Sequence, residues 1–350
     1  MTRRDILALA CGSPALLASV SDFAPPLENP PRLGAAPMAF WQRIQASRSG
    51  GQPFDLIEHC HKLGLAGVQT NPPSTDPDAI RLFRERIERY QMHLICDPQL
   101  PRHKGDVDTF EAQVRAYQEA GAIAFHAALT GRRYEDFDSF GAWKTMFEAV
   151  QASVELAEPV LRKYRVRLGI ENHKGYRAAE QAVWLKRLSS EYVGVCFDFG
   201  NNLALCEQPM ETLRTLLPYV FFTHIKDVAV EDYEDGFLLS EVPFGEGILE
   251  LKAMVQLLRQ EDPNVIFELE MITRDPLKIP VFSPKYWATF DDSYSPLPGR
   301  DLAKTLALVR KNKLKAPLPR VAGLSSGERV KLEDESNLKC IAWARQSLAL

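Results

Sequence analysis

Four side chains of types that commonly bind metal ions lie near the ends of four separate apolar segments. Glu171 lies in VRLGIEN, Asp198 in VGVCFDF, His224 in VFFTHIKD and Glu270 in NVIFELEM. A buried carboxylate without a partner is costly, so an apolar strand that ends in one requires a cation, a polar partner or solvent at that point. Two Glu, one Asp and one His suit a divalent cation that takes oxygen ligands. The set predicts one divalent ion, Mn²⁺ or Mg²⁺ first, with Co²⁺ or Zn²⁺ as alternatives.

These side chains converge only if the segments that carry them are neighbouring strands. From Arg32 onward, short apolar runs alternate with amphipathic stretches in eight successive strand and helix units. The strands have the continuous apolar character of a sheet buried on both faces, so the order predicts a (βα)8 TIM barrel over 32–314. In that fold the chemistry lies at the carboxyl ends of the strands, where the metal-type residues are found.

The apolar runs give the expected position of each strand. They are LGAAPMAF, GVQTN, HLICDP, AIAFHAALT, VRLGIEN, VGVCFDF, VFFTHIKD and NVIFELEM. The longest helix is expected from 139 to 164 and the last barrel helix from Asp301 to Lys311. Residues 315–350 form a C-terminal extension of this single domain, with a helix at its end. Trp343 in that helix is expected to close the bottom of the barrel or to pack across the interface of a homo-oligomer.

Composition narrows the class of partner. The chain has 350 residues, of which 45% are apolar, and this suffices for one barrel of about 250 residues with extensions. The formal net charge of −4 leaves no surplus of basic residues to neutralise phosphates, which disfavours a nucleic-acid partner. A small-molecule substrate is expected instead. The six cysteines contain no CxxC pair, so neither a disulfide scaffold nor a zinc ribbon is predicted.

The N-terminal segment has the layout of an export signal. Arg3 and Arg4 precede an apolar stretch of small residues, and a Pro-rich polar segment follows. This pattern predicts a twin-arginine signal peptide over 1–24 and therefore a periplasmic or secreted protein. The alternative is an amphipathic lead-in that stays attached, which would leave the protein in the cytoplasm. No later segment approaches the run of about 20 apolar residues that a membrane span needs.

The alternation of side chains along a strand indicates which of them point inward. In FFTHIKD, His224 and Lys226 share a face, whereas Asp227 lies on the other face or in the following loop. In FELEM, Glu268 and Glu270 share a face, with Glu270 nearer the mouth, so Glu270 is the expected ligand and Glu268 lies deeper beside a cation. Lys226 is expected to bind a substrate hydroxyl or a developing oxyanion. An ion pair with Glu268 or Asp227 is the alternative.

The motif order identifies a family that the chain resembles. IENH, FDFGN, HIKD, FGEG and FELEM, on an eightfold pattern from Arg32 to about Lys313, resemble the xylose isomerase-like superfamily of sugar isomerases and epimerases. The resemblance implies sugar substrates. It also implies a single divalent ion bound by one residue from each of four strands, which here are Glu171, Asp198, His224 and Glu270.

Sugar isomerisation and epimerisation agree with such a site. Both reactions remove a proton from the carbon next to a carbonyl, and a metal ion chelated by the carbonyl and its neighbouring hydroxyl stabilises the enediolate. Glu171 and Glu270 are expected on opposite sides of the sugar, where one takes the proton and the other returns it. The same site could instead carry out β-elimination, as a keto-glycoside lyase or dehydratase. A third alternative is a barrel that binds sugar without turnover, or supports an oxidoreductase as a subunit.

Six further residues are candidates for contact with the substrate. They are His173, His126, Asn201, Asp97, Glu246 and Arg274. Some have structural alternatives. His173 could be a loop histidine satisfied by the backbone, Asp97 an N-cap or turn residue, and Arg274 a partner for Asp275. The glycines on either side of Glu246 could simply serve a tight turn.

One departure from the superfamily separates its branches. The endonuclease IV-like branch holds three zinc ions with additional histidines, one of them three residues after the Asp. Here Asn201 stands at that position, where it is expected to contact sugar or to form a turn, and Val228 to Glu246 contains no histidine. A trinuclear phosphodiesterase is therefore disfavoured, in agreement with the acidic net charge.

Overall fold

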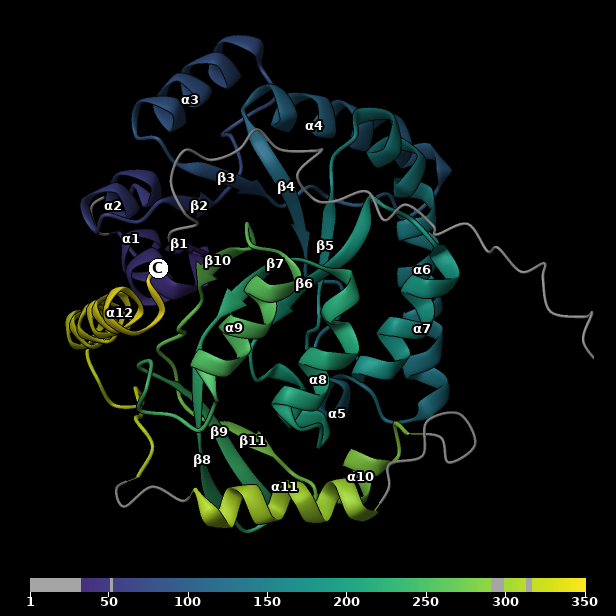
Figure 1. Ribbon diagram of the computed structural model, residues 1–350, viewed down its shortest axis with the longest axis vertical. Helices are drawn as coiled ribbons and strands as arrows, with labels where there is room; N and C mark the ends of the chain where they lie inside the picture. Colours follow the sequence, from purple (N-terminus) through teal and green to yellow (C-terminus); the bar gives the residue numbers. More distant parts are fainter. Residues whose placement is uncertain (1–32, 51–52, 291–298, 313–316) are drawn as a thin grey trace, which may run out of the picture.

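Eight parallel strands close into a barrel, as the sequence predicts (Figure 1). The computed structural model describes residues 33–50, 53–290, 299–312 and 317–350. The barrel strands are β1 (Leu33–Ala35), β2 (Gly67–Gln69), β3 (His93–Cys96), β4 (Ala122–Ala127), β5 (Leu168–Glu171), β6 (Val193–Asp198), β7 (Val220–Ile225) and β10 (Ile266–Leu269). The expected signal peptide over 1–24 lies outside the described residues.

Most of the helices lie around the barrel and cover its outer face, and a few lie apart from it at the bottom of Figure 1. The helices are α1 (Trp41–Arg48), α2 (Leu56–Lys62), α3 (Pro77–Arg89), α4 (Val107–Glu119), α5 (Arg133–Asp136), α6 (Phe140–Tyr164), α7 (Ala178–Leu188), α8 (Pro209–Leu216), α9 (Leu251–Glu261), α10 (Pro284–Trp287), α11 (Gly299–Lys311) and α12 (Ser326–Leu348). The long helix expected from 139 is α6, and the Ser139 hydroxyl caps its start by accepting from the Ala142 amide. Within the described residues, no helix has the length and apolar character needed to cross a membrane.

Strand register decides which side chains meet at the mouth of the barrel. In the parallel pairing, His224 of β7 stands opposite Asp198 of β6 on one side and Glu268 of β10 on the other. Every residue of β5 and of β6 is buried, as expected of strands covered on both faces. The ends of β6, β7 and β10 therefore bring polar side chains together inside an apolar wall.

The first strand is shorter than the sequence indicates. LGAAPMAF was expected to be one strand, but β1 ends at Ala35 and a 3₁₀ helix covers Pro37–Phe40. Proline fixes its φ angle and has no amide hydrogen for a sheet, so Pro37 starts the helical turn instead of continuing the strand.

A second, antiparallel sheet follows β7 and was not expected from the sequence. It consists of β8 (Asp227–Tyr233), β9 (Gly236–Val242) and β11 (Leu277–Ile279), with β9 in the centre. Its buried apolar side chains pack with those of α11, which lies along this sheet in Figure 1. The helix expected at Asp301 to Lys311 therefore exists as α11, but it covers the added sheet.

The C-terminal extension completes the ring of helices. Its helix α12 contacts α1 and α9, and lies beside α1 in Figure 1. The buried carboxylate of Glu333 accepts hydrogen bonds from the backbone amides of Gln42, at 2.6 Å, and Arg43, at 3.1 Å. Trp343 packs edge-on against Phe244, which follows β9. Trp343 therefore packs on the segment after β9, while its neighbour Ile341 in α12 lines a cavity with Leu33 at the start of β1.

Glu333 makes the stability of the fold depend on pH. Burial raises the pKa of Glu333 to about 7 from its usual 4.5, so the folded protein holds this proton over a pH range in which the unfolded chain has released it. The stabilisation that Glu333 contributes is therefore complete below its pKa in the unfolded chain. It is lost as the pH rises towards its pKa in the folded protein. The free energy of unfolding of the wild type, relative to Glu333→Gln, should fall by about 1 kcal/mol per pH unit in that window.

Urea denaturation of both proteins at several pH values between 4.5 and 8 measures this difference. Glu335→Gln is the matched control, because Glu335 lies on the same helix and is exposed. A wild-type and Glu333→Gln difference that stays constant with pH would contradict the prediction.

Candidate active site

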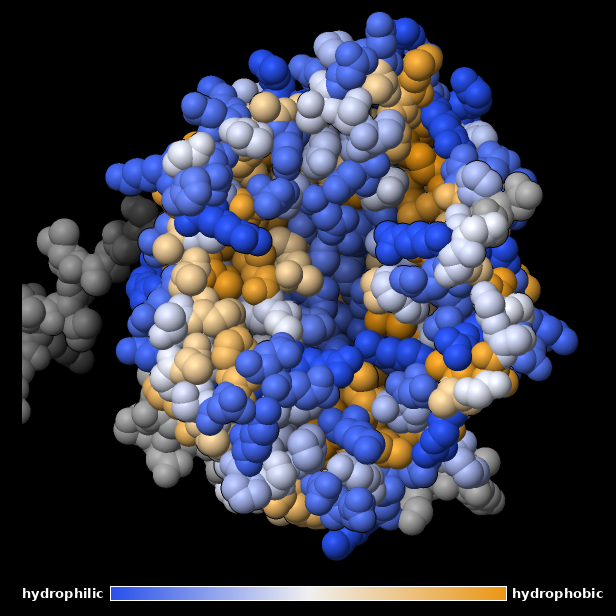
Figure 2. Space-filling view, turned by 180° about the vertical axis from the view of Figure 1, so that it is seen from behind, coloured by the Kyte–Doolittle hydropathy of each residue, from blue (hydrophilic) through white to orange (hydrophobic). Residues whose placement is uncertain are grey.

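The four predicted metal ligands lie together at the carboxyl ends of adjacent strands. Glu171 ends β5, Asp198 ends β6, His224 is the penultimate residue of β7, and Glu270 directly follows β10. All four are buried, with exposed fractions of 4%, 1%, 1% and 6%. On the face opposite to that of Figure 1, the surface is hollowed near its centre and hydrophilic side chains line the hollow (Figure 2).

Three of these residues form a compact donor set. The ligand atoms of Glu171, His224 and Glu270 all lie within 4.8 Å of one another. Nδ1 of His224 is 3.7 Å from Oε2 of Glu171 and 3.4 Å from Oε1 of Glu270. This nitrogen is buried and has no hydrogen-bond partner. Its lone pair or proton therefore faces the two carboxylates without forming a hydrogen bond.

Asp198 forms an ion pair with Lys226, for which the sequence analysis named other partners. Nζ of Lys226 lies 2.7 Å from Oδ2 of Asp198 and 2.9 Å from Oε2 of Glu270. The alternative given for Lys226, an ion pair with Glu268 or Asp227, is therefore wrong. The side chain of Lys226 follows the last residue of β7 and runs inward between β6 and β10, so it meets the carboxylates at the ends of those strands.

Glu268 and Asp227 have other partners. Glu268 lies deeper, as expected from the alternation, and its carboxylate contacts His93 of β3. The carboxylate of Asp227 accepts hydrogen bonds from the backbone amides of Gly245, at 2.9 Å, and Gly247, at 3.1 Å. Asp227 therefore shapes the loop after β9 and does not enter the site.

Burial and neighbouring charges set the protonation of the carboxylates. Burial acts to raise the pKa of Glu270, but Lys226 and His224 outweigh it and hold that pKa well below its usual range. Burial likewise opposes ionisation of Glu171, and its hydrogen bond from His126 and nearby histidines outweigh it to lower the pKa. For Asp198, burial dominates over the attraction of Lys226 and raises the pKa well above the ordinary value. Glu171 and Glu270 are thus the ionised pair at neutral pH.

The donor set fits a divalent cation. Oδ1 of Asp198 and Nδ1 of His224 are both buried polar atoms without a hydrogen-bond partner, and such orphaned atoms are rare in folded proteins. They lie beside two carboxylates whose ionised state is favoured. Carboxylate oxygens and one imidazole nitrogen are the ligands expected for Mn²⁺, Mg²⁺, Co²⁺ or Zn²⁺.

A second layer of polar residues stands behind the donor set. Nδ1 of His126 lies 2.6 Å from Oδ1 of Asp97, and its Nε2 lies 3.2 Å from Oε2 of Glu171. Burial lowers the pKa of His126, but these two carboxylates outweigh it and raise the pKa to about 10. His126 is therefore protonated and donates to both carboxylates. His126 and Asp97 were predicted from the sequence as substrate contacts, and the structure places His126 against Glu171 and Asp97 behind His126.

Gln69 was missed by the sequence analysis. Its amide nitrogen donates to Oδ1 of Asp97 at 2.8 Å, and its amide oxygen lies 2.7 Å from Nε2 of His224. The oxygen accepts from Nε2, so a neutral His224 turns the lone pair of Nδ1 towards Glu171 and Glu270. A signal was present, because Gln69 is a polar residue at the end of the apolar strand β2, as the predicted ligands are on theirs.

Asn201 lies within the site, as one of its two predicted roles requires. Its amide nitrogen donates to Oε1 of Glu171 at 3.0 Å and also contacts Oδ2 of Asp198. Its amide oxygen accepts from the ammonium of Lys174, a residue that the sequence analysis did not single out. Asn201 therefore links the donor set to a lysine in the loop after β5.

The structure does not bring the other three candidates into the donor set. Nδ1 of His173 donates to the backbone oxygen of Gly131 at 3.0 Å, which is the structural alternative for this histidine. Glu246 points to solvent with 54% of its side chain exposed, 3.3 Å from Lys339 of α12. Because Asp227 binds the backbone on either side of Glu246, the loop turns that side chain outward.

Arg274 has a partner other than the one expected. Its Nε lies 3.2 Å from Oε2 of the buried Glu241 on β9, and its Nη2 also contacts that carboxylate. The expected pairing of Arg274 with Asp275 is wrong, because Asp275 accepts from the backbone amides of Val321 and Ala322. The hairpin that supplies Glu241 was not predicted, so the sequence offered no sign of this ion pair.

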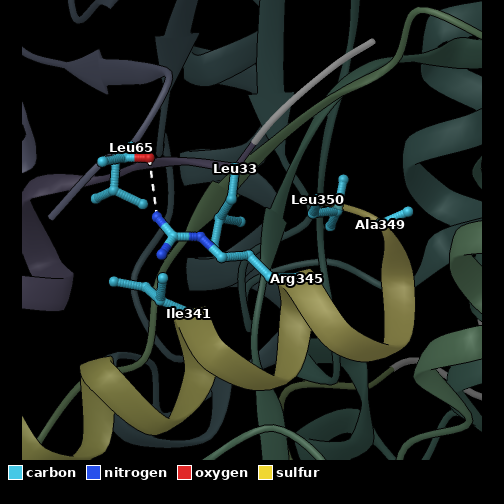
Figure 3. Close-up of a pocket in the computed structure, with 7 residues that line it drawn as sticks. Leu33, Leu65, Ile341, Arg345, Ala349 and Leu350 are labelled. Carbon is cyan, nitrogen blue, oxygen red and sulfur yellow. Dashed lines mark hydrogen bonds between the residues drawn. The ribbon is translucent and has the colours of Figure 1, made fainter.

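A cavity of about 380 Å³ lies at the opposite end of the barrel (Figure 3). It is lined by Leu33, Leu65, Ile341, Leu350 and the side chain of Arg345, among others. The Arg345 guanidinium is engaged by the backbone oxygens of Leu63 and Gly64. Without a carboxylate or histidine in its lining, this cavity is not the candidate active site.

The fold and the composition of the site agree with the result of a family comparison. Residues 57–289 match the family described as xylose isomerase-like TIM barrel. The chain belongs to this family, which confirms the resemblance found in its motifs.

Individual relatives are more distant. The chain is 29% identical to the 3-oxo-isoapionate decarboxylase of Pectobacterium atrosepticum over 109 residues, which are 31% of this chain and only 40% of that enzyme. It is 22% identical to the uncharacterised protein YihM of Escherichia coli over 298 residues, 81% of this chain and 82% of that protein. A crystal structure of D-psicose 3-epimerase in the presence of D-fructose has a similar fold, with a TM-score of 0.56 and 14% identity over 91% of this chain and 100% of that one.

Gln69 gives the first prediction about metal binding. Gln69→Leu removes the oxygen that fixes the tautomer of His224, so a fraction of that histidine will present a proton to the metal. We expect the affinity for Mn²⁺ to fall by about 10- to 100-fold, the usual effect of losing such a supporting hydrogen bond. Calorimetric titration of metal into chelator-treated protein measures it. Gln118→Leu, at an exposed glutamine, should leave the affinity unchanged, and an unaltered affinity in folded Gln69→Leu would refute the role of Gln69.

Proposed function

We propose that the protein is a divalent-metal-dependent sugar isomerase or epimerase that acts by removing a proton next to a carbonyl. The observation that carries this proposal is the pair of buried glutamates, Glu171 and Glu270, whose carboxylates flank His224 with ligand atoms within 4.8 Å. Two ionised carboxylates beside one another in a buried site are costly unless the site uses them. A proton acceptor and a proton donor on two sides of a substrate is such a use.

Four residues would hold the metal ion, which we propose to be Mn²⁺ first, with Mg²⁺, Co²⁺ or Zn²⁺ as alternatives. They are Glu171, Asp198, His224 and Glu270. A divalent ion bound there supplies Lewis-acid polarisation of the sugar carbonyl and stabilises the negative charge that develops on its oxygen. Membership of the family and the two orphaned donor atoms support this assignment.

The residues of the chain itself would carry the proton. One ionised glutamate accepts the proton from the carbon next to the carbonyl, and the electron pair of that C–H bond forms the double bond of the enediolate. The other glutamate, once it has taken a proton from solvent, returns that proton to the opposite face of the same carbon in an epimerisation, or to the neighbouring carbon in an isomerisation. Lys226 lies within hydrogen-bond distance of Glu270 and would orient a substrate oxygen beside it.

A lyase is the second candidate, and one observation favours it. The relative named as a decarboxylase acts, by its name, on a 3-oxo acid. Loss of CO₂ from such an acid leaves an electron pair next to a carbonyl, which is the same kind of intermediate that proton removal gives. Elimination of water or of a glycosidic oxygen from a keto-glycoside would pass through it as well. A dehydratase or keto-glycoside lyase would therefore need the same side chains.

A barrel that binds sugar without turnover is the third candidate. Such a protein, or a subunit of an oxidoreductase, has no use for two ionised glutamates around one histidine. The pair therefore supports an enzyme over a binding protein.

Exchange of the substrate hydrogen separates these candidates. Metal-loaded protein is incubated in D₂O with a panel of ketoses and 3-keto-glycosides, and products are identified by NMR. We expect deuterium to enter at the carbon next to the carbonyl, and Glu171→Gln or Glu270→Gln to slow this by about 10²- to 10⁴-fold. Bound metal is measured in each variant, so that loss of a base is not confused with loss of the ion.

Glu246→Gln is the matched control, because Glu246 is a glutamate of the same motif set that points to solvent. It should exchange at the wild-type rate. If no sugar that binds the metal-loaded wild type exchanges its hydrogen, the proton-transfer proposal fails. Release of a glycosidic alcohol or of CO₂ would favour the lyase.

We also propose that the protein is exported through the twin-arginine route, on the basis of Arg3 and Arg4 and the apolar stretch after them. Expressed in a bacterium with that pathway, the wild type should appear in the periplasmic or secreted fraction, and Arg3→Lys with Arg4→Lys should keep it in the cytoplasm. Because lysine preserves the charge, the pair tests recognition of arginine itself. Wild-type protein found only in the cytoplasm would contradict the proposal.

A further inference from the structure

Lys174, in the loop after β5, carries a buried ammonium group without an acidic partner. Only 3% of the residue is exposed, and its Nζ donates to the neutral amide oxygen of Asn201. Among the described residues, no carboxylate oxygen lies within 4.0 Å of it. A buried ammonium that is paired only with an amide costs free energy, so its retention beside the site requires an explanation.

The other cations of the site all have acidic partners. Lys226 bridges Asp198 and Glu270 at 2.7 and 2.9 Å. His126 lies between two carboxylates, and Arg274 is held by that of Glu241. Among these described residues, the ammonium of Lys174 is therefore the one positive charge without a carboxylate at ion-pair distance, although Asp198 and Glu241 attract it from farther away.

The ammonium of Lys174 lies next to the donor set, on the far side of Asn201. One side chain, that of Asn201, separates its Nζ from the carboxylates of Glu171 and Asp198. The backbone of Lys174 is fixed, because its carbonyl oxygen accepts from the amide of Arg133 at 3.0 Å. The ammonium is thus held in advance, one amide group away from the residues proposed to act on the sugar.

The lowered pKa of Lys174 agrees with a buried ammonium group that lacks a negatively charged partner. Burial, followed by repulsion from Lys226 and Arg274, lowers the pKa of Lys174 to about 8. The group is still mostly protonated at neutral pH. An anion placed against it would add an attraction that offsets the cost of burying the charge.

The pairing of the cations indicates what kind of group is missing. Lys226, His126 and Arg274 each contact a carboxylate, and the ammonium of Lys174 contacts only the amide of Asn201. One buried ammonium matches the single negative charge of a carboxylate better than the two charges of a phosphate dianion. We propose that the substrate is a sugar acid and that Lys174 binds its carboxylate. The inference rests on the proposed function, which makes the substrate a sugar.

Matched pairs of sugars test the proposal. D-Fructuronate and D-fructose share one skeleton and differ in a terminal carboxylate or hydroxymethyl group, and D-tagaturonate and D-tagatose form a second pair. Titration calorimetry with Mn²⁺-loaded protein should show an acid of at least one pair binding about tenfold more tightly than its neutral partner. In Lys174→Met that preference should vanish, while the affinity for the neutral ketose stays within about twofold. Lys144→Met, at an exposed lysine of α6, is the control and should behave as the wild type.

A second measurement examines the unpaired charge directly. Lys174→Met removes a buried ammonium that has no acidic partner, so its melting temperature without ligand should exceed that of the wild type. A lower melting temperature would overturn the claim that the charge is unpaired. Equal affinities for acid and neutral sugars in both pairs, or a preference that persists in Lys174→Met, would overturn the assignment to a sugar acid.

Hydrogen exchange keeps this inference distinct from the proposed function. If sugar acids bind through Lys174 but none exchanges its hydrogen in D₂O, the isomerase proposal fails and the binding assignment stands. If neutral sugars exchange while neither acid is preferred, the assignment of Lys174 fails and the isomerase proposal stands.

Discussion

The mutual repulsion of carboxylates inside an apolar barrel governs the arrangement of the site. Glu171, Asp198 and Glu270 lie at the ends of strands whose other residues are buried, so water cannot screen their charges. The chain offsets them with two internal cations, Lys226 between Asp198 and Glu270 and His126 against Glu171. Most hydrogen bonds of the site follow from this need for compensation.

The sequence was sufficient for the barrel and for the positions of the metal-type residues. Strand ends can be recognised when an apolar run stops at a polar residue, and in this fold all such ends face one mouth. That is why Glu171, Asp198, His224 and Glu270 could be placed together before the structure was known. His126, Asp97 and Asn201 were found by the same reasoning, since His126 lies near the end of β4 and the other two follow strands.

Pairwise contacts were less predictable, because they depend on register and on loop paths. Lys226 lies beyond the last residue of its strand, where alternation no longer fixes direction, and its true partners come from β6 and β10. Arg274 pairs with Glu241, and the hairpin containing Glu241 has no counterpart in a plain strand and helix repeat. Gln69 was overlooked because an amide is uncharged, although its two ends decide how His224 and Asp97 are oriented.

The contact between Glu333 and α1 has a consequence for synthesis of the protein. The carboxylate that satisfies the amides of Gln42 and Arg43 comes from a residue 291 and 290 positions later in the chain. A ribosome must therefore complete almost the entire polypeptide before the start of the first helix is capped. Copies truncated before α12 leave these amides without their acceptor and the flank of α1 bare. The fold of the first helix is thus complete only in a chain that extends through Glu333.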